Sequence, residues 1–302
     1  MGTMTTTTDR IPIARLRAGG PIEGVFACTR KDRMTARTGS AYLAIELRDR
    51  SGSIPARAFR EADYLAGQFE RGDLVAVAGH VERFRDELQV ALKTIKRAQG
   101  EASDPGEFLP VAYRDMEELD GFLEHLSREV YDADLRRLLD SFLGDDAFRA
   151  DFRRAPCTRS GHHAYLGGLI EHTVAVGTLA YETCALHPRL NSDLLLCAAI
   201  LHDVGKTLEF ELGGAEIAFS EAGALVGHLT LGQQLVTERA RQLDAFPEAK
   251  LHALSHCILA HHGPDPLPGR RFRSAEALAL YRLNALDAGV KGVLEHGFRL
   301  DE

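Results

Sequence analysis

Tryptophan is absent from this chain, and aromatic residues make up only 7% of it. The longest uninterrupted apolar run, residues 194–201, is far shorter than the roughly 20 residues that a membrane-spanning helix requires. The first residues also lack the charged-then-apolar pattern of a signal peptide. We therefore expect a cytoplasmic protein with no membrane partner.

Paired cysteines are also missing. The chain has five cysteines, an odd number, and no C-x-x-C spacing, so neither a disulfide framework nor a cysteine zinc site is indicated. We expect ordinary thiols in a reducing compartment, most of them buried. They are Cys28, Cys157, Cys184, Cys197 and Cys257.

The net charge of −8 hides two halves of different character. Residues 1–100 hold 17 basic against 12 acidic side chains, whereas residues 101–302 hold 19 against 32. A basic first half suits a polyanionic partner, and an acidic second half can still act on phosphates if bound cations reverse the local field. The alternative, that both signs are only solvated surface, stays open.

The first 99 residues have the period-two pattern of strands. Residues 40–48 place Leu43, Ile45 and Leu47 on one face and more polar side chains on the other, which predicts a half-buried strand. Residues 54–59 predict the second strand of a hairpin. A short helix over residues 61–69 is followed by strands over 74–81 and 87–95. About five strands with a helix between the third and fourth predict a small closed barrel of the OB type.

The outward faces of the second and third strands of such a barrel bind nucleic acid, through aromatic stacking and basic side chains. Tyr42 is the best stacking candidate and Arg57 lies on the following strand, while Phe59 is expected to favour packing into the barrel. We place further basic residues in the adjoining loop, where plain solubility is the alternative role: Arg30, Lys31, Arg33 and Arg37. The few aromatics predict weak, sequence-tolerant binding of single strands.

The composition divides the chain into two domains. We expect a barrel domain over residues 1–99, with residues 1–10 disordered, and a Pro- and Gly-punctuated linker over residues 100–112. Over residues 113–302, apolar side chains recur three and four positions apart, which predicts amphipathic helices. The predicted fold class is a small all-β barrel followed by an all-α bundle.

Ten of the thirteen histidines fall between residues 162 and 262. Imidazoles and carboxylates presented from several separate helices are what a two-metal hydrolytic site needs, and they suit Mn, Fe, Co, Ni or Zn better than Ca. The candidate ligands follow one another as His172, His202, Asp203, His228, His261, His262 and Asp287.

The adjacent pair His202 and Asp203 follows the apolar run, which predicts a buried helix. Neighbouring residues on a helix diverge by about 100°, so this pair can converge on one metal cluster only where the helix ends. Residues 204–206 supply the turn, and Lys206 then stands close enough to meet a phosphate oxygen.

Five short motifs resemble those of HD-domain metal-dependent phosphohydrolases. They are residues 168–173 (GLIEHT), 201–206 (LHDVGK), 227–230 (GHLT), 260–263 (AHHG) and 284–288 (NALDA). A barrel before such a domain, together with residues 161–168 (GHHAYLGG), resembles the YhaM-type 3′-5′ exoribonucleases. The resemblance implies the metal ligands His172, His202, Asp203, His228, His261 and Asp287, with His262 a further ligand or a phosphate contact.

The resemblance also implies an activity: exonucleolytic hydrolysis of single-stranded RNA, and possible hydrolysis of single-stranded DNA, to mononucleotides. We expect two divalent ions, manganese first among the candidates, with Asp203 bridging them and Lys206 stabilising charge on the phosphate. His162 and His163 are expected either to contact substrate or metal near the site or to hydrogen bond at a helix start. His256 is expected to be a satisfied core histidine.

Two other functions remain open. One is an HD-type phosphohydrolase acting on small nucleotides or cyclic dinucleotides, for which a polymer-binding barrel adds little. The other is a non-catalytic single-strand binder, which the full set of candidate ligands disfavours. A homo-oligomer is compatible with the sequence.

Overall fold

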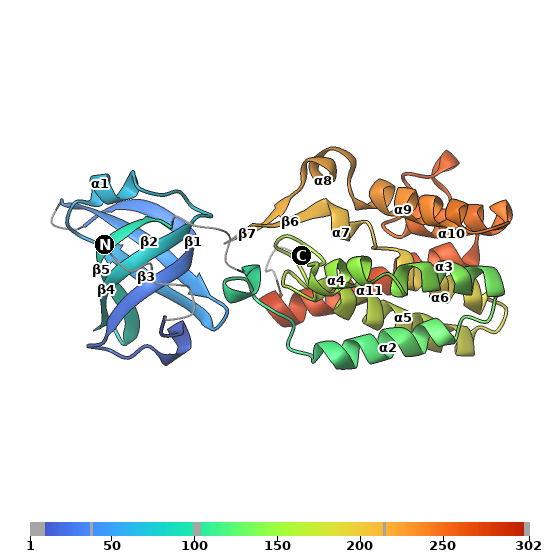
Figure 1. Cartoon of the computed structure of the whole chain (residues 1–302), viewed down its shortest axis with the longest axis horizontal. Helices are drawn as coiled ribbons and strands as arrows, with labels where there is room; N and C mark the ends of the chain where they lie inside the picture. Colours follow the sequence, from blue (N-terminus) through green and yellow to red (C-terminus); the bar gives the residue numbers. More distant parts are fainter. Residues whose placement is uncertain (1–9, 37–38, 99–103, 214–215, 299–302) are drawn as a thin grey trace. The chain divides into compact units, whose positions relative to one another are not determined.

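The computed structural model describes residues 10–36, 39–98, 104–213 and 216–298 (Figure 1). The chain divides into two compact units, residues 1–110 with 212–217, and residues 111–211 with 218–302. The segment expected to be disordered lies outside the described residues apart from Arg10, as do Arg37 and the first residues of the expected linker. No helix in the described ranges is long and apolar enough to cross a membrane.

The first unit contains a closed barrel of five strands in the order β1-β2-β3-β5-β4, which confirms the predicted OB-type fold (Figure 1). Only the β3–β5 pairing is parallel; the others are antiparallel. The elements are η2 (Ile13–Arg15), β1 (Pro21–Thr35), β2 (Ala41–Asp49), β3 (Gly52–Ala58), α1 (Ala62–Ala66), β4 (Leu74–Phe84), β5 (Glu87–Arg97) and η3 (Pro105–Glu107).

The barrel forms because alternate side chains of each strand point inward. On β2, Leu43 and Leu47 are buried, and their partners on β3 are the buried Ala58 and Ile54. A shift of one residue in this pairing would turn these side chains out to solvent, so burial fixes the register. The polar side chains between them remain on the outer surface, where a ligand can reach them.

One expectation about the barrel is wrong. Arg30, Lys31 and Arg33 lie on strand β1 rather than in a loop, because β1 continues to Thr35, which pairs with Ala41. All three also have acidic neighbours: Arg30 pairs with Asp32, Lys31 with Glu70 at 2.9 Å, and Arg33 with Asp63 at 2.9 Å. Part of the positive charge assigned to nucleic acid is therefore neutralised within the barrel unit.

The second unit is helical, as predicted, with one short hairpin that the sequence analysis did not anticipate. Its helices are α2 (Met116–Arg128), α3 (Ala133–Leu143), α4 (Asp146–Arg154), α5 (Gly168–Leu186), α6 (Ser192–Leu201), α7 (Lys206–Glu209), α8 (Glu221–Val226), α9 (His228–Gln242), α10 (Glu248–Ala260), η4 (Pro268–Arg270) and α11 (Ala275–His296). The hairpin consists of β6 (Phe210–Gly213) and β7 (Glu216–Phe219), whose residues 212–213 and 216–217 fall in the first unit.

Helix α6 is the centre of the helical core. Every side chain from Leu194 to Leu201 is buried, and α2, α3, α5, α10 and α11 all pack against this helix. A helix that is apolar on all sides requires such a complete shell. Because α6 is held on every side, the residues at its C-terminal end are fixed in position.

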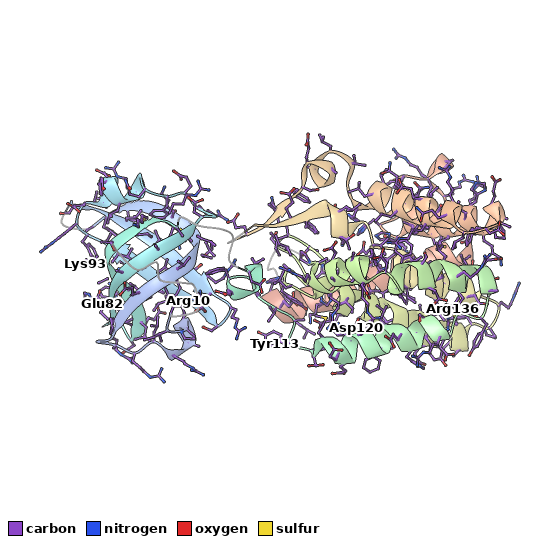
Figure 2. The ribbon with its side chains drawn as sticks, viewed as in Figure 1. Arg10, Glu82, Lys93, Tyr113, Asp120 and Arg136 are labelled. Carbon is purple, nitrogen blue, oxygen red and sulfur yellow. The ribbon has the colours of Figure 1, made fainter. Side chains whose placement is uncertain are left out.

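Aspartates set the starts of the outer helices. The side chains of Asp115, Asp132 and Asp145 each accept two backbone N–H groups in the first turn of α2, α3 and α4. Helices α2 and α4 are also joined by charge. Asp120, labelled in Figure 2, is buried and lies 3.3 Å from Arg149 and 2.8 Å from Arg153.

Candidate metal centre

Five segments of the helical unit bring the predicted ligands together. His172 comes from the first turns of α5, His228 is the first residue of α9, and Asp287 lies on α11. His261 directly follows α10, and His262 comes next. His202 and Asp203 follow the end of α6, where His202 is the C-terminal cap and the chain turns into α7. This turn lets the His202 Nε2 atom approach the Asp203 Oδ2 atom to 3.3 Å.

Asp203 lies in the middle of the cluster and is only 1% exposed. Its Oδ2 atom is 3.3 Å from His202 Nε2 and 3.6 Å from His172 Nε2. Its Oδ1 atom is 3.2 Å from His261 Nε2 and 3.6 Å from His228 Nε2. The two oxygens of one carboxylate therefore face two different pairs of imidazoles.

Hydrogen bonds on the outer side of the cluster fix the tautomers of three histidines. The Nδ1 atom of His202 is 2.8 Å from the Ala199 carbonyl, and that of His261 is 2.7 Å from the Ile258 carbonyl. The Nδ1 atom of His228 is 2.9 Å from the Glu209 carboxylate. These oxygens only accept, so each Nδ1 carries the proton and each Nε2 directs a lone pair toward Asp203. Metal-binding histidines are oriented in this way.

Two buried atoms of the cluster have no hydrogen-bond partner. They are Asp203 Oδ1 and His261 Nε2, which approach each other without hydrogen-bond geometry. An unsatisfied buried polar atom costs about 1–3 kcal/mol, so such atoms call for an explanation. A divalent cation would satisfy both. The donor atoms fit this reading, because one atom each of Asp203, His228, His261 and His262 lies within 4.8 Å of the others, and so does one each of His172, His202 and Asp203.

The second carboxylate of the predicted ligand set, Asp287, contacts His172. Asp287 Oδ2 is 2.6 Å from His172 Nδ1 and 3.1 Å from His163 Nε2. Asn284 lies one turn earlier on α11; its side-chain oxygen is 3.0 Å from His172 Nε2, and its amide donates to the His261 carbonyl at 3.1 Å. Asn284 was not predicted, although it begins the motif that contains Asp287 and has the i, i+3 spacing of one helix face.

A buried chain of hydrogen bonds continues outward from Asp287. His163 Nδ1 is 2.7 Å from the Tyr165 hydroxyl, which donates to Glu171 Oε2 at 2.8 Å. Lys291 donates to the other oxygen of Glu171 at 2.9 Å. Glu171 therefore contacts this chain of side chains rather than its neighbour His172. The chain ties α5 to α11 and restrains both from the side opposite Asp203.

The electrostatics favour the ionised form of Asp203 and the neutral forms of His172, His261 and His262. Burial opposes the charge of Asp203, but the ammonium of Lys206 at 3.0 Å outweighs it and holds the pKa of Asp203 well below its usual range. Burial lowers the pKa of His172 and, strongly, that of His261, and it lowers the pKa of His262 to about 4. Ionised carboxylates and neutral imidazoles are the forms that bind cations.

Lys206 is not exposed to a substrate in this structure. It is 5% exposed, and its Nζ atom contacts Asp203 and lies 3.4 Å from Cys157 Sγ. Burial raises the pKa of Cys157 to about 12. His162 is near His172, whereas His256 is half-buried, accepts the Arg273 N–H at 3.0 Å and lies outside the cluster.

The outer face of the barrel carries the aromatic residues considered for nucleic-acid binding. Tyr42 and Phe59 stack at 5.2 Å between ring centroids, and the Arg57 guanidinium is 5.8 Å from the Tyr42 ring and 5.2 Å from the Phe84 ring. Phe59 is 55% exposed, so the expectation that it packs into the barrel is wrong. It follows the last residue of β3 and is therefore free to lie on Tyr42. Phe84, at the end of β4, was not predicted.

Two family models match the two units. Residues 169–289 match the HD domain, and residues 27–98 match an OB-fold nucleic acid binding domain. The helical unit is an HD domain. The HD match spans His172, His202, Asp203, His228, His261 and Asp287. It implies divalent-metal binding and identifies the protein as a hydrolase, a phosphohydrolase with a nucleic-acid-binding domain.

The matches to relatives extend over both units of this chain. The 3′-5′ exoribonuclease YhaM of Listeria monocytogenes is 28% identical over 272 residues, which cover 87% of this chain and 84% of the relative. YhaM of Listeria welshimeri is 28% identical over 274 residues with the same coverage. The chain is a homologue of the YhaM exoribonucleases, as the sequence motifs predicted.

Two solved structures are each similar to less than a third of this chain. The second OB-fold domain of replication protein A from Methanococcus maripaludis is 17% identical, covers 31% of this chain and 98% of its own, and gives a TM-score of 0.25. The single-stranded DNA binding protein from Thermus aquaticus is 23% identical, covers 28% and 43% of the two chains, and gives a TM-score of 0.24.

Proposed function

We propose that this HD-domain protein is a 3′-5′ exoribonuclease that degrades single-stranded RNA, and single-stranded DNA as a second substrate, to mononucleotides. The observation that carries the proposal is the position of Asp203, whose two oxygens face separate pairs of histidines. The names of the Listeria relatives support the direction of digestion and the choice of RNA.

The donor groups support a centre for two divalent ions, for which we propose manganese. One group comprises His172, His202 and Asp203, with Asp287 beside His172, and the other comprises Asp203, His228, His261 and His262. Divalent ions in such a site supply a water nucleophile at neutral pH and neutralise the charge of the phosphodiester.

The protein's own side chains then have distinct roles. Asp203 belongs to both donor groups and is the residue on which their spacing depends. Glu209 and the carbonyls of Ala199 and Ile258 hold the imidazoles in the tautomer that directs Nε2 inward. Lys206 compensates the buried charge of Asp203, and we propose that the same cation stabilises charge developing on the phosphate.

For the barrel we propose a strand-holding role. Tyr42 and Phe59 offer stacked aromatic faces, and Arg57 lies between them and Phe84, an arrangement that suits bases and phosphates of a single strand. Arg30, Lys31 and Arg33 would contribute weaker backbone contacts, since carboxylates already neutralise them. We propose that Arg37 also contacts the strand; Arg37 lies outside the described residues.

The experiment follows a short single-stranded RNA labelled at its 5′ end or its 3′ end, with Mn²⁺ present. The proposal predicts immediate release of labelled mononucleotide from the 3′-labelled strand and progressive shortening of the 5′-labelled strand. Asp203→Asn should lower kcat/KM by about a thousandfold, the equivalent of roughly 4 kcal/mol of lost transition-state stabilisation.

Asp265→Asn is the matched control, because Asp265 is an exposed carboxylate that belongs to none of the groups of possible metal ligands among the described residues. It should leave the rate unchanged. Hydrolysis of cyclic dinucleotides with no action on RNA would favour a small-molecule phosphohydrolase instead. Binding of RNA without any Mn²⁺-dependent product would favour a non-catalytic binder.

A further inference from the structure

Cys157 is a buried thiol at the edge of the candidate metal centre, and it has no role in the proposed hydrolysis. It lies between α4 and α5, has no exposed surface, and its Sγ atom is 3.4 Å from Lys206 Nζ and 3.9 Å from Asp203 Oδ2. The other four cysteines, all within the described ranges, belong to no group of possible metal ligands. The position of Cys157 is therefore distinctive within this chain.

Cys157 forms a donor group with two histidines. One ligand atom each of Cys157, His162 and His172 lies within 4.8 Å of the others. His162 is half-buried and its ring centroid is 5.8 Å from that of His172. One sulfur and two imidazole nitrogens are the donors that zinc and cadmium prefer, whereas manganese prefers sites richer in oxygen.

The group shares His172 with the proposed catalytic set. The same imidazole also lies close to Asp203, His202 and Asp287. An ion that draws His172 toward Cys157 and His162 would withdraw it from those partners. Two classes of cation would thus compete for one side chain.

We propose that Cys157, His162 and His172 form a binding site for a thiophilic divalent ion, zinc or cadmium, and that its occupation inhibits hydrolysis by removing His172 from the catalytic set. The second half of the statement rests on the proposed function. In the binding step the Cys157 S–H bond breaks, a sulfur–metal bond forms and the proton passes to solvent, so nothing is oxidised or reduced. The ammonium of Lys206 stabilises the resulting thiolate.

The binding half is tested on the metal-free full-length protein by titration with Co²⁺ or Cd²⁺. Coordination by a thiolate produces a sulfur-to-metal charge-transfer band in the near ultraviolet, which does not depend on activity. We expect this band in the natural protein and in Cys184→Ser, a half-exposed cysteine control, but not in Cys157→Ser or Cys157→Ala. His162→Gln should weaken the affinity read from the band by about 10–100-fold. A missing band in the natural protein, or one that survives in both Cys157 variants, would overturn the proposal.

Inhibition is tested by measuring the rate of RNA hydrolysis at fixed Mn²⁺ with and without Zn²⁺. The ratio of the two rates is then compared between variants. Zinc should lower the rate of the natural protein and of Cys184→Ser at concentrations at which Cys157→Ser keeps most of its own rate. Equal zinc inhibition of all three would contradict this half. If no variant hydrolyses RNA, the proposed function fails, and the charge-transfer titration still decides whether the thiophilic site exists.

Discussion

At the scale of single residues, the hydrogen bonds behind the histidines decide which ring nitrogen faces Asp203. Glu209 is the only side chain among these partners of His202, His228 and His261, because the other two partners are backbone carbonyls. Glu209 also accepts the backbone N–H of His228 at 3.0 Å. This carboxylate therefore holds both the ring and the first turn of α9.

Glu209→Gln should consequently weaken Mn²⁺ binding by about 10–100-fold, the usual effect of removing a carboxylate behind a metal-binding histidine. Isothermal titration of the metal-free protein measures the affinity. Glu221→Gln, an exposed glutamate at the start of α8, is the control and should bind Mn²⁺ as the natural protein does. Identical affinities for the two variants would show that Glu209 does not orient a ligand.

The buried histidines also make the stability of the metal-free protein depend on pH. Burial lowers the pKa of His172 and His261, and lowers that of His162 from 6.5 to about 4. In the unfolded chain these groups take up protons near pH 6.5, before the folded state does. Their contribution to stability is thus fully present above pH 6.5 and is lost as the pH falls toward about 4.

The thermal unfolding midpoint of the metal-free protein should therefore be lower at pH 5 than at pH 7.5. The low pKa values of Asp203 and Asp287 act in the same direction at still lower pH. His162→Gln should flatten the pH dependence, since it removes one of these groups. A midpoint that stays constant or rises on acidification would contradict the burial of neutral imidazoles.

The sequence motifs made the clustering of these histidines and aspartates predictable, whereas the side chains that contact them from behind were not. Lys291 contacts Glu171 across 120 positions of the sequence, and Asn284 contacts His172 across 112. Only the folded chain brings such residues together. Glu209 was missed for another reason: a glutamate in a four-residue helix has no pattern that separates it from a surface residue.

At the scale of elements, the turn between α6 and α7 positions His228. A Cβ atom on Gly205 would lie 2.2 Å from the His228 carbonyl oxygen and 2.4 Å from the Gly232 nitrogen, both backbone atoms of α9. No side chain fits in this contact. The close approach of α7 to α9 is therefore the reason that His228 reaches Asp203.

Gly205→Ala should lower the free energy of unfolding by about 1–3 kcal/mol, as overpacking does, and should reduce Mn²⁺ affinity because His228 shifts with α9. Gly121→Ala is the control: Gly121 lies on α2 with nothing within 4 Å of its would-be Cβ. This change should stabilise the protein by about 0.5–1 kcal/mol. Denaturant unfolding measures the stability of both variants, and metal titration measures their Mn²⁺ affinity. A Gly205→Ala variant with unchanged stability and affinity would show that this contact does not position His228.

Element boundaries were predictable wherever burial imposed a period. Helix α3 and strand β2 follow their apolar patterns closely. The end of β1 does not, because residues 29–35 are exposed or half-buried and carry no alternation of apolar and polar side chains. Arg30, Lys31 and Arg33 therefore read as loop residues although they are paired in a sheet. The β6–β7 hairpin was missed for another reason: each strand has four residues, too few for an alternation to be distinctive.

At the scale of the whole molecule, we propose a division of work in which the barrel holds a single strand and the helical domain hydrolyses it. The sequence predicted this division from its charge asymmetry and motifs. The apolar character of Phe59 favours the barrel interior, whereas the alternation that buries Ile54, Ala56 and Ala58 places Phe59 outward with Arg57, where it stacks on Tyr42. That contact is a property of the folded surface.

Tyr42→Ala and Arg57→Ala should each weaken binding of single-stranded RNA, by about 1–3 kcal/mol for a lost base stack at Tyr42. Hydrolysis of a small chromogenic phosphodiester should not change, since the metal centre lies in the other unit. Tyr113→Ala is the control, because Tyr113 is fully exposed outside the barrel (Figure 2). Fluorescence anisotropy with labelled RNA measures binding. A parallel loss on both substrates would contradict the division of roles.

Our central proposal is that Asp203, whose two carboxylate oxygens face separate pairs of histidines, would hold two divalent ions. Anomalous diffraction from a crystal of the full-length protein grown with Mn²⁺ tests this most directly. We expect two manganese peaks, both in contact with Asp203. One should also contact His172 and His202, and the other His228 and His261. No peak at this cluster, or a single peak that does not touch Asp203, would contradict it.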